Sequence, residues 1–215
     1  MFDLRSQSSV LVACVFVSLS ACSNGLFQKS ESGSNADGAS AGDVQRKRNA
    51  DTDLESVTGD IAVVAGLDSV VPNETEDDST MLMFQEQHSL VLPSALGCDL
   101  PSDADGEVGA GTTVNAYFVH FDPVGRATKH FSASVVFPDE ILCLAFSTKN
   151  LEAGDAVVGR DDVVYPEPGS ASERGLEYPG QDKVSVGADR RTLSVELTTS
   201  TSSDQLRVFT LAAPK

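Results

Sequence analysis

The feature that most constrains the fold is an apolar alternation of period two in the C-terminal half of the chain. Residues 130–137 carry an apolar side chain at every second position, and residues 192–198 repeat the pattern with three aliphatic side chains. Strict alternation indicates a half-buried β-strand with one face on a core. Five further strands are expected, over 81–92, 112–121, 141–147, 184–187 and 205–211, with turn-rich segments between them.

No amphipathic helix of three turns is expected anywhere in the chain. Seven or eight short strands in about 135 residues fit an all-β domain of the two-layer type. The sequence therefore predicts a single two-sheet β-sandwich, with jelly-roll and immunoglobulin-like topologies both open.

The N-terminus has the form of a secretory signal peptide. Residues 6–28 contain no charged side chain, and Arg5 precedes a compact apolar run over 10–18. This run is shorter than the roughly 18 to 20 residues that a membrane-spanning helix needs. The sequence Leu19-Ser20-Ala21-Cys22 follows and resembles the lipobox of bacterial lipoproteins. The resemblance implies that residues 1–21 are removed and that Cys22 is acylated; a chance cysteine after a cleavage site is the alternative.

Acylation at Cys22 would anchor the protein without a membrane-crossing segment. Two or three acyl chains bury many CH₂ groups, at about 0.8 kcal/mol each, so the attachment is expected to be stable. By analogy with lipoproteins of two-membrane cells, Ser23 at the next position implies transfer to the outer membrane. We therefore expect a lipid-anchored protein of the cell envelope, with the membrane as its partner through Cys22.

Composition divides the rest of the chain into three parts. Residues 22–56 are rich in small polar residues and are expected to be a flexible, disordered tether. Residues 57–80 carry six acidic side chains and no Lys or Arg, and their short apolar runs could add an edge strand. Residues 81–215 form the expected β-sandwich domain, with its boundary near residue 80.

Charge and motif content exclude several classes of function. The chain has 15 Lys+Arg against 32 Asp+Glu, a formal net charge of -17, which repels the phosphates of nucleic acids and anionic membrane surfaces. HExxH, GxSxG and P-loop patterns are absent from the sequence. The sequence thus predicts neither a nucleic-acid partner, nor a cofactor, nor an enzymatic activity.

An ordered series of short segments resembles an uncharacterised β domain of exported bacterial proteins, many of which carry a PEP-CTERM sorting tail. The segments are Phe84-Gln85-Glu86-Gln87, Val119-His120-Phe121-Asp122-Pro123-Val124-Gly125, Phe137-Pro138-Asp139-Glu140-Ile141-Leu142, Arg174-Gly175-Leu176-Glu177, Asp189-Arg190-Arg191-Thr192-Leu193 and Asp204-Gln205-Leu206-Arg207-Val208. The resemblance runs from about residue 81 to 213. It implies a β domain and export, but no activity, because none is established for that family.

Two of the four cysteines remain once Cys14 leaves with the signal peptide and Cys22 is acylated. An even pair in an exported, oxidising compartment indicates a disulfide between Cys98 and Cys143. It would close a loop of about 45 residues and add around 3 to 4 kcal/mol of stability. Two buried free thiols are the alternative, and the resembling family more often has Gly at the position of Cys143.

Acidic residues near the first of these cysteines have some character of a calcium loop. The residues are Asp99, Asp103, Asp105 and Glu107. Hard cations take several oxygen ligands on a turn. The spacing does not match an EF-hand, because Pro101 stands where the first acid is needed, so a solvated acidic loop is the alternative.

The histidines and several arginines are expected to have structural roles. His88, His120 and His130 are expected to be ordinary strand residues, since nothing in their spacing indicates a converging zinc site. Residues 189–191, and Asp204 with Arg207, are expected to form ion pairs that protect exposed strand edges. An arginine pair that recognises a carboxylate ligand is the alternative.

These observations favour a membrane-anchored bacterial lipoprotein that presents a non-enzymatic interaction or structural module. An envelope protein or glycan would be its partner. The alternative is a calcium- or saccharide-binding module that uses the loops at residues 99–107 and 161–169.

Overall fold

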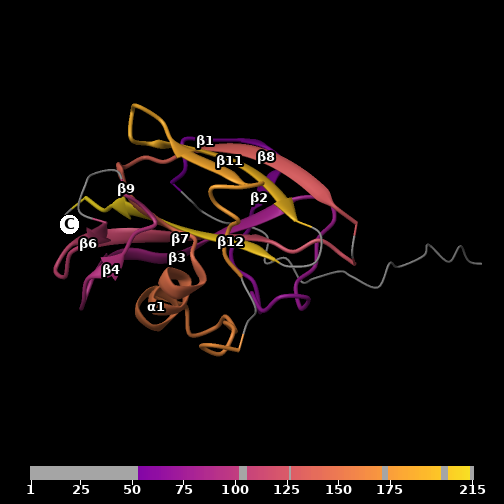
Figure 1. Ribbon diagram of the computed structural model, residues 1–215. Coiled ribbons are helices and arrows are strands. Elements are labelled where there is room, and N and C mark those ends of the chain that lie inside the picture. Colours follow the sequence, from indigo (N-terminus) through magenta and orange to yellow (C-terminus); the bar gives the residue numbers. More distant parts are fainter. Residues whose placement is uncertain (1–52, 102–105, 126, 171–173, 200–202, 214–215) are drawn as a thin grey trace, which may run out of the picture. The chain divides into compact units, whose positions relative to one another are not determined.

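The structure, a computed structural model, describes residues 53–101, 106–125, 127–170, 174–199 and 203–213. Strands dominate these residues (Figure 1). One sheet has the order β1 (Ser56–Gly59), β8 (Lys129–Val136), β11 (Thr192–Thr199) and β10 (Lys183–Val186). A second has the order β2 (Ile61–Val63), β3 (Met81–Val91), β7 (Thr113–Phe121), β12 (Asp204–Leu211), β9 (Ile141–Ala145) and β5 (Leu100–Pro101). A small ribbon pairs β4 (Leu96–Gly97) with β6 (Glu107–Val108).

The two large sheets enclose an apolar core. From the six-stranded sheet it receives Met81 and Met83 of β3 and Leu206 and Val208 of β12. The four-stranded sheet contributes the alternating side chains expected from the sequence: Ala133, Val135, Leu193, Val195 and Leu197. The all-β, two-sheet sandwich predicted from the period-two pattern is therefore confirmed.

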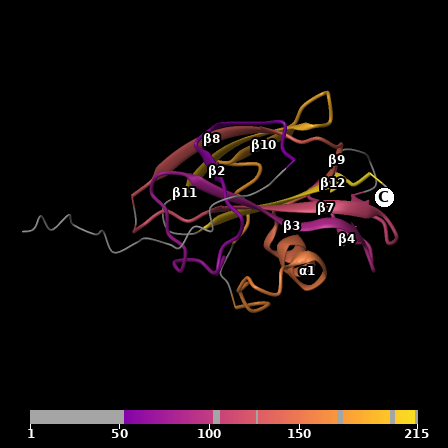
Figure 2. The same cartoon turned by 180° about the vertical axis from the view of Figure 1, so that it is seen from behind.

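A third layer covers the outer face of the six-stranded sheet. Helix α1 (Thr148–Val158) lies on the side of this sheet away from β8 and β11, as the two opposite views show (Figures 1 and 2). With the neighbouring loops it covers further apolar side chains of β3 and β7, including Leu82, Phe84 and Phe118. Because both faces are covered, β7 and β12 are buried along almost their whole length.

The helix corrects the expectation that the chain has no helix of three turns. Its buried residues Leu151, Gly154 and Val158 follow the spacing i, i+3, i+7, which is one helical face. Ser147 caps the N-terminus, where its side chain accepts a hydrogen bond from the Asn150 N–H. The pattern escapes sequence reading because only two of the three buried positions are apolar.

Strand pairing extends N-terminal of residue 80. β1 pairs with β8 of the four-stranded sheet, and β2 pairs with β3 at the edge of the six-stranded sheet. Asp60 alone separates the two strands, and Gly59 turns the chain with a φ of 87°. The edge strand expected within residues 57–80 corresponds to β2.

Candidate functional site

A bidentate ion pair is fully buried beneath α1. Glu86 lies on β3 and Arg207 on β12, and both side chains are 0% exposed. Arg207 donates from Nε and Nη2 to the Glu86 carboxylate at 2.6 and 2.8 Å. It also reaches α1, through Nη2 to Asp155 Oδ1 at 2.8 Å and Nη1 to the Leu151 carbonyl at 2.9 Å. The guanidinium fork thus fastens the helix to the sheet.

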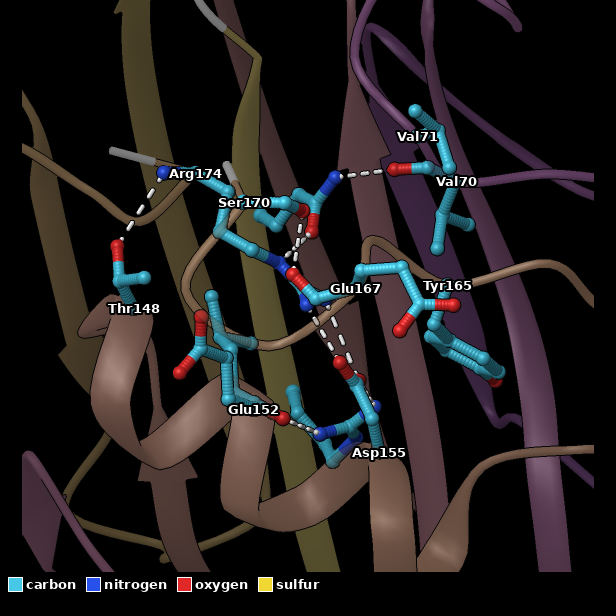
Figure 3. A network of polar contacts seen from close by, with 12 residues as sticks. Val70, Val71, Thr148, Glu152, Asp155, Tyr165, Glu167, Ser170 and Arg174 are labelled. Carbon is cyan, nitrogen blue, oxygen red and sulfur yellow. Dashed lines mark hydrogen bonds and ion pairs between the residues drawn. The ribbon is translucent and has the colours of Figure 1, made fainter. Parts of the chain in front are cut away.

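Arg174 joins the same group of side chains (Figure 3). Its Nε donates to Gln205 Oε1 at 2.6 Å, and its two terminal nitrogens donate to the Asp155 carboxylate at 2.5 and 3.3 Å. Gln205 Nε2 donates in turn to the Val70 carbonyl at 2.6 Å. We call these five side chains the buried ionic network: Glu86, Asp155, Arg174, Gln205 and Arg207.

The buried ionic network contains two positive and two negative charges. Burial would lower the pKa of Arg207, but the adjoining carboxylates of Glu86 and Asp155 raise it above its usual value. Both guanidinium groups also lie near the ring of Phe118, at 4.9 Å for Arg207 and 6.0 Å for Arg174. Because each buried charge has an opposite charge in contact, the desolvation cost of burial is offset.

Gly154 allows α1 to approach Arg207 this closely. A Cβ atom at this position would overlap the Arg207 guanidinium. Glycine inside a helix costs roughly 0.5–1 kcal/mol relative to alanine. Glycine is nevertheless favoured at position 154, because the absence of a side chain leaves room for the Arg207 guanidinium.

A buried histidine stands at one end of the network. His120 Nδ1 lies 3.2 Å from Gln205 Nε2, and His120 Nε2 lies 3.7 Å from Asp122 Oδ2. Burial, together with the positive charge of Arg174, lowers the pKa of His120 to about 3. The imidazole is therefore neutral at neutral pH, and it accepts at Nδ1 from the Gln205 amide.

Tyr165 stands at the other end. Its hydroxyl donates to Glu86 Oε1 at 2.6 Å and accepts from the Arg160 N–H at 3.2 Å. Burial, and then the negative charge of Glu86, raises the pKa of this phenol above its usual range. Tyr165 consequently stays protonated and acts as a fixed hydrogen-bond donor.

A hollow of about 400 Å³ opens at the surface beside Tyr165. Its walls come from two segments, 71–72 and 164–170, which are joined by a parallel bridge between Ser69 and Val164. They are mostly apolar, with the hydroxyl of Ser170 and the carboxylate of Glu167 as polar groups. We call it the Tyr165 hollow; it includes part of the 161–169 loop that the sequence suggested as a ligand loop.

A second buried polar group contains only acids. Asp122, Asp182 and Asp204 are all at most 4% exposed. Burial, and then the charge of Asp182, raises the pKa of Asp204 to about 8, and burial raises the pKa of Asp122 to about 6. Asp204 Oδ2 has no hydrogen-bond partner in the described part of the chain. Asp204 is therefore protonated at neutral pH.

Of the four residues proposed for calcium, the structure describes Asp99 and Glu107. Asp99 accepts from the backbone N–H groups of Phe146 and Ser147 at 2.6 Å each, and from Asn150 Nδ2 at 2.8 Å. Its carboxylate thus anchors the start of α1. Glu107 is exposed on β6, whereas Asp103 and Asp105 lie outside the described residues. Among the described residues, no group of three or more His, Cys, Asp or Glu side chains could hold a metal ion.

The expected disulfide is present. Cys98 and Cys143 are bonded, with their Cα atoms 5.5 Å apart and a sequence separation of 45. The bond joins the segment that carries Asp99 to β9, next to the start of α1. Cys22 lies outside the described residues, so its acylation stays a prediction.

The expected edge roles of Arg207 and Asp204 are wrong, because Arg207 is fully buried where β12 meets α1, and Asp204 is buried near Asp122 and Asp182. Arg190 and Arg191 do form surface ion pairs, with Glu140 and Glu55, and Asp189 accepts from the Arg191 and Thr192 N–H groups. The histidines lie on three different strands, with His88 and His130 exposed and His120 buried.

The sequence analysis missed the buried ionic network, although a signal for it exists. On β3, Glu86 shares the outer face with Leu82 and Phe84, and on β12 Arg207 shares it with Phe209. A charged residue in register with apolar neighbours indicates a buried partner of opposite sign. The partner cannot be identified without the topology, because Glu86 and Arg207 are 121 residues apart.

Comparison of the chain with family models, curated proteins and solved structures found no match. In the described residues, no helix is long and apolar enough to cross a membrane.

Proposed function

We propose that this chain is a lipid-anchored protein of the bacterial cell envelope. The observation that carries the proposal is the division of its cysteines. Cys98 and Cys143 are joined to each other in the folded part, whereas Cys22 follows Leu19-Ser20-Ala21 directly after an apolar run. A structural disulfide is typical of proteins that fold in an oxidising, exported compartment, and the sequence before Cys22 resembles the lipobox of bacterial lipoproteins. In a cell with two membranes, Ser23 favours the outer membrane.

The domain acts as a non-enzymatic interaction or structural module. The buried ionisable groups support this role, because Glu86, Asp155, Arg174 and Arg207 satisfy one another and Tyr165 donates to Glu86. Such a network fixes the positions of α1 and the loops around the Tyr165 hollow. A preorganised surface of this kind favours recognition, since little conformational entropy is lost on binding.

The intact mass of the protein extracted from membranes tests the anchor. We expect a mass of residues 22–215 plus two or three acyl chains. Cys98 and Cys143 should react with a thiol alkylating reagent only after reduction. The matched control is Cys22→Ala, which should lack the acyl mass and leave the membrane fraction. If the wild-type protein, like this control, carries no acyl mass and is absent from the membrane fraction, the proposed anchor is wrong.

A further inference from the structure

A second hollow, of about 530 Å³, opens beside the start of α1 and is separate from the Tyr165 hollow in its lining. Its walls include the loop that contains Glu177, Tyr178 and Gln181, together with Ser147 and Thr148. Tyr178 is 44% exposed, and among the described Phe and Tyr residues it is the only exposed one. We call this site the Tyr178 hollow.

The Tyr178 ring is held in place from behind. It packs on Phe146 in an edge arrangement, with ring centroids 5.3 Å apart and planes at 66°. Phe146 belongs to the core between the two sheets and is 4% exposed. An aromatic ring that is fixed on the core and exposed to solvent offers a flat apolar surface at low entropic cost.

The loop around this ring is also fixed. The buried carboxylate of Asp182 accepts from the Glu177 N–H at 2.7 Å and from the Thr198 N–H at 2.9 Å, which ties the loop to β11. A Cβ at Gly175 would overlap the Phe146 carbonyl, and one at Gly180 would overlap the Glu177 carbonyl. Both glycines therefore permit a tight backbone path, and the hollow is formed before any ligand arrives.

Polar groups of both kinds surround the ring. Gln181 Nε2 donates to Glu177 Oε2 at 3.0 Å, which leaves further donor and acceptor positions on an adjacent amide and carboxylate. The Thr148 hydroxyl accepts from the Arg174 N–H at 3.2 Å, so its own proton can be donated. Mixed donors and acceptors beside an apolar platform match a sugar ring, which has hydroxyls at its edge and C–H groups on its face.

The electrostatics of this site disfavour an anionic ligand. The N–H of Ser147 at the start of α1 already bonds to Asp99, and the Asn150 N–H bonds to Ser147 Oγ, so these helix amides are engaged. Glu177 adds a negative charge to the wall, and the chain as a whole carries -17. A neutral ligand is favoured over a phosphate or a sugar acid.

We propose that the Tyr178 hollow binds a neutral saccharide, with one pyranose ring stacked on Tyr178 and its hydroxyls bonded to Glu177 and Gln181. The saccharide site names a ligand class for the interaction module proposed above. Its location in the cell envelope rests on the proposed lipid anchor, whereas the binding of the saccharide does not.

Calorimetric titration of the full-length protein with soluble neutral hexasaccharides tests the proposal. The probes are malto-, cello- and chitohexaose, and the protein is kept in a detergent that has no sugar headgroup. We expect at least one probe to bind, and Tyr178→Ala to weaken that binding by about tenfold or more. Tyr178→Phe should retain the affinity within about threefold, because it keeps the ring.

Further variants separate stacking from loss of the fold. Glu177→Ala, which removes an exposed side chain, should weaken binding severalfold with an unchanged melting temperature. Val164→Ser, in the Tyr165 hollow, should leave the affinity for the saccharide unchanged. Absence of binding by all three probes at millimolar concentration, or equal binding by wild type and Tyr178→Ala, would overturn the saccharide site. Neither result bears on acylation, which the mass measurement tests independently.

Discussion

The molecule buries charge in two places near β12, and it does so in opposite ways. Arg207 and Gln205 belong to the buried ionic network, in which two arginines face two carboxylates. Asp204, at the start of the same strand, is buried near Asp182 and Asp122. In the first region, ion pairing keeps the groups charged. In the second, burial among acids raises the pKa of Asp204 to about 8, so this carboxyl becomes neutral by taking up a proton.

The difference shows two uses of buried polar groups. The balanced network positions a structural element, since its hydrogen bonds join β3, β12 and α1. The acidic group makes stability dependent on pH instead, because a proton is taken up when the chain folds.

Breaking the balance of the network should have the largest effect. Glu86→Ala leaves Arg207 without its bidentate partner and gives the network a net positive charge. We expect the free energy of unfolding to fall by about 3–5 kcal/mol, measured by urea denaturation at pH 7. The matched control is Glu196→Ala, which removes one partner of the exposed pair with Lys183 and should cost no more than about 1 kcal/mol. Equal losses in the two variants would contradict the role of the network.

Replacing the buried acid Asp204 by a neutral side chain should have an effect of opposite sign. An Asp with an unfolded pKa near 3.8 and a folded pKa of about 8 takes up a proton on folding between these values. Its contribution to stability is therefore present below pH 4 and lost as the pH rises to 8. Asp204→Asn does not titrate, so we expect it to gain stability relative to wild type between pH 4 and pH 8, by up to about 5 kcal/mol, since one pKa unit corresponds to about 1.36 kcal/mol.

The comparison of Asp204→Asn with wild type isolates this one group. His120, with its pKa lowered to about 3, makes stability rise with pH between 3 and 6.5, and Asp122, with its pKa raised to about 6, acts in the opposite direction between 3.8 and 6. Both groups are present in the two proteins, so the difference reports on Asp204 together with its interaction with Asp122. Thermal denaturation from pH 4 to pH 8 should show the gap widening with pH; a constant gap would contradict the assignment.

Asp99 is an intermediate case, in which two backbone N–H groups donate to a carboxylate. Asp99→Ala removes two backbone hydrogen bonds and one from Asn150 at the start of α1. We expect a loss of about 1 kcal/mol in unfolding free energy. Relative to wild type, Asp99→Ala should speed amide hydrogen exchange in the first turn of α1 and leave the exchange of β8 unchanged. Added calcium should not change the stability of wild type if this carboxylate serves only the helix, whereas calcium-dependent stabilisation would support the metal alternative.

The sheets could be predicted because their signal is local. Each inner-facing residue of β8 and β11 can be assigned from its two neighbours, without knowledge of its partner strand. The disulfide could be predicted from the cysteine count and the expected compartment. The buried ionic network could not, because its meaning depends on which residues the fold brings together from β3, β12 and α1. The helix lay between these cases, since Gly154 occupies a core-facing position where the sequence pattern requires an apolar side chain.

The corner at Asp60 has a mechanical consequence. β1 and β2 lie in different sheets and are separated by this one residue, which bonds to both sides: its N–H donates to the Ser132 carbonyl at 2.7 Å, and its carbonyl accepts from the Met81 N–H at 2.9 Å. Tension applied to the chain before Ser56 would be transmitted first to β1 and β8, and through the corner to β2 and β3. A force that pulls on the N-terminus would thus have to detach two edge strands in succession, one from each sheet, before the core strands are loaded.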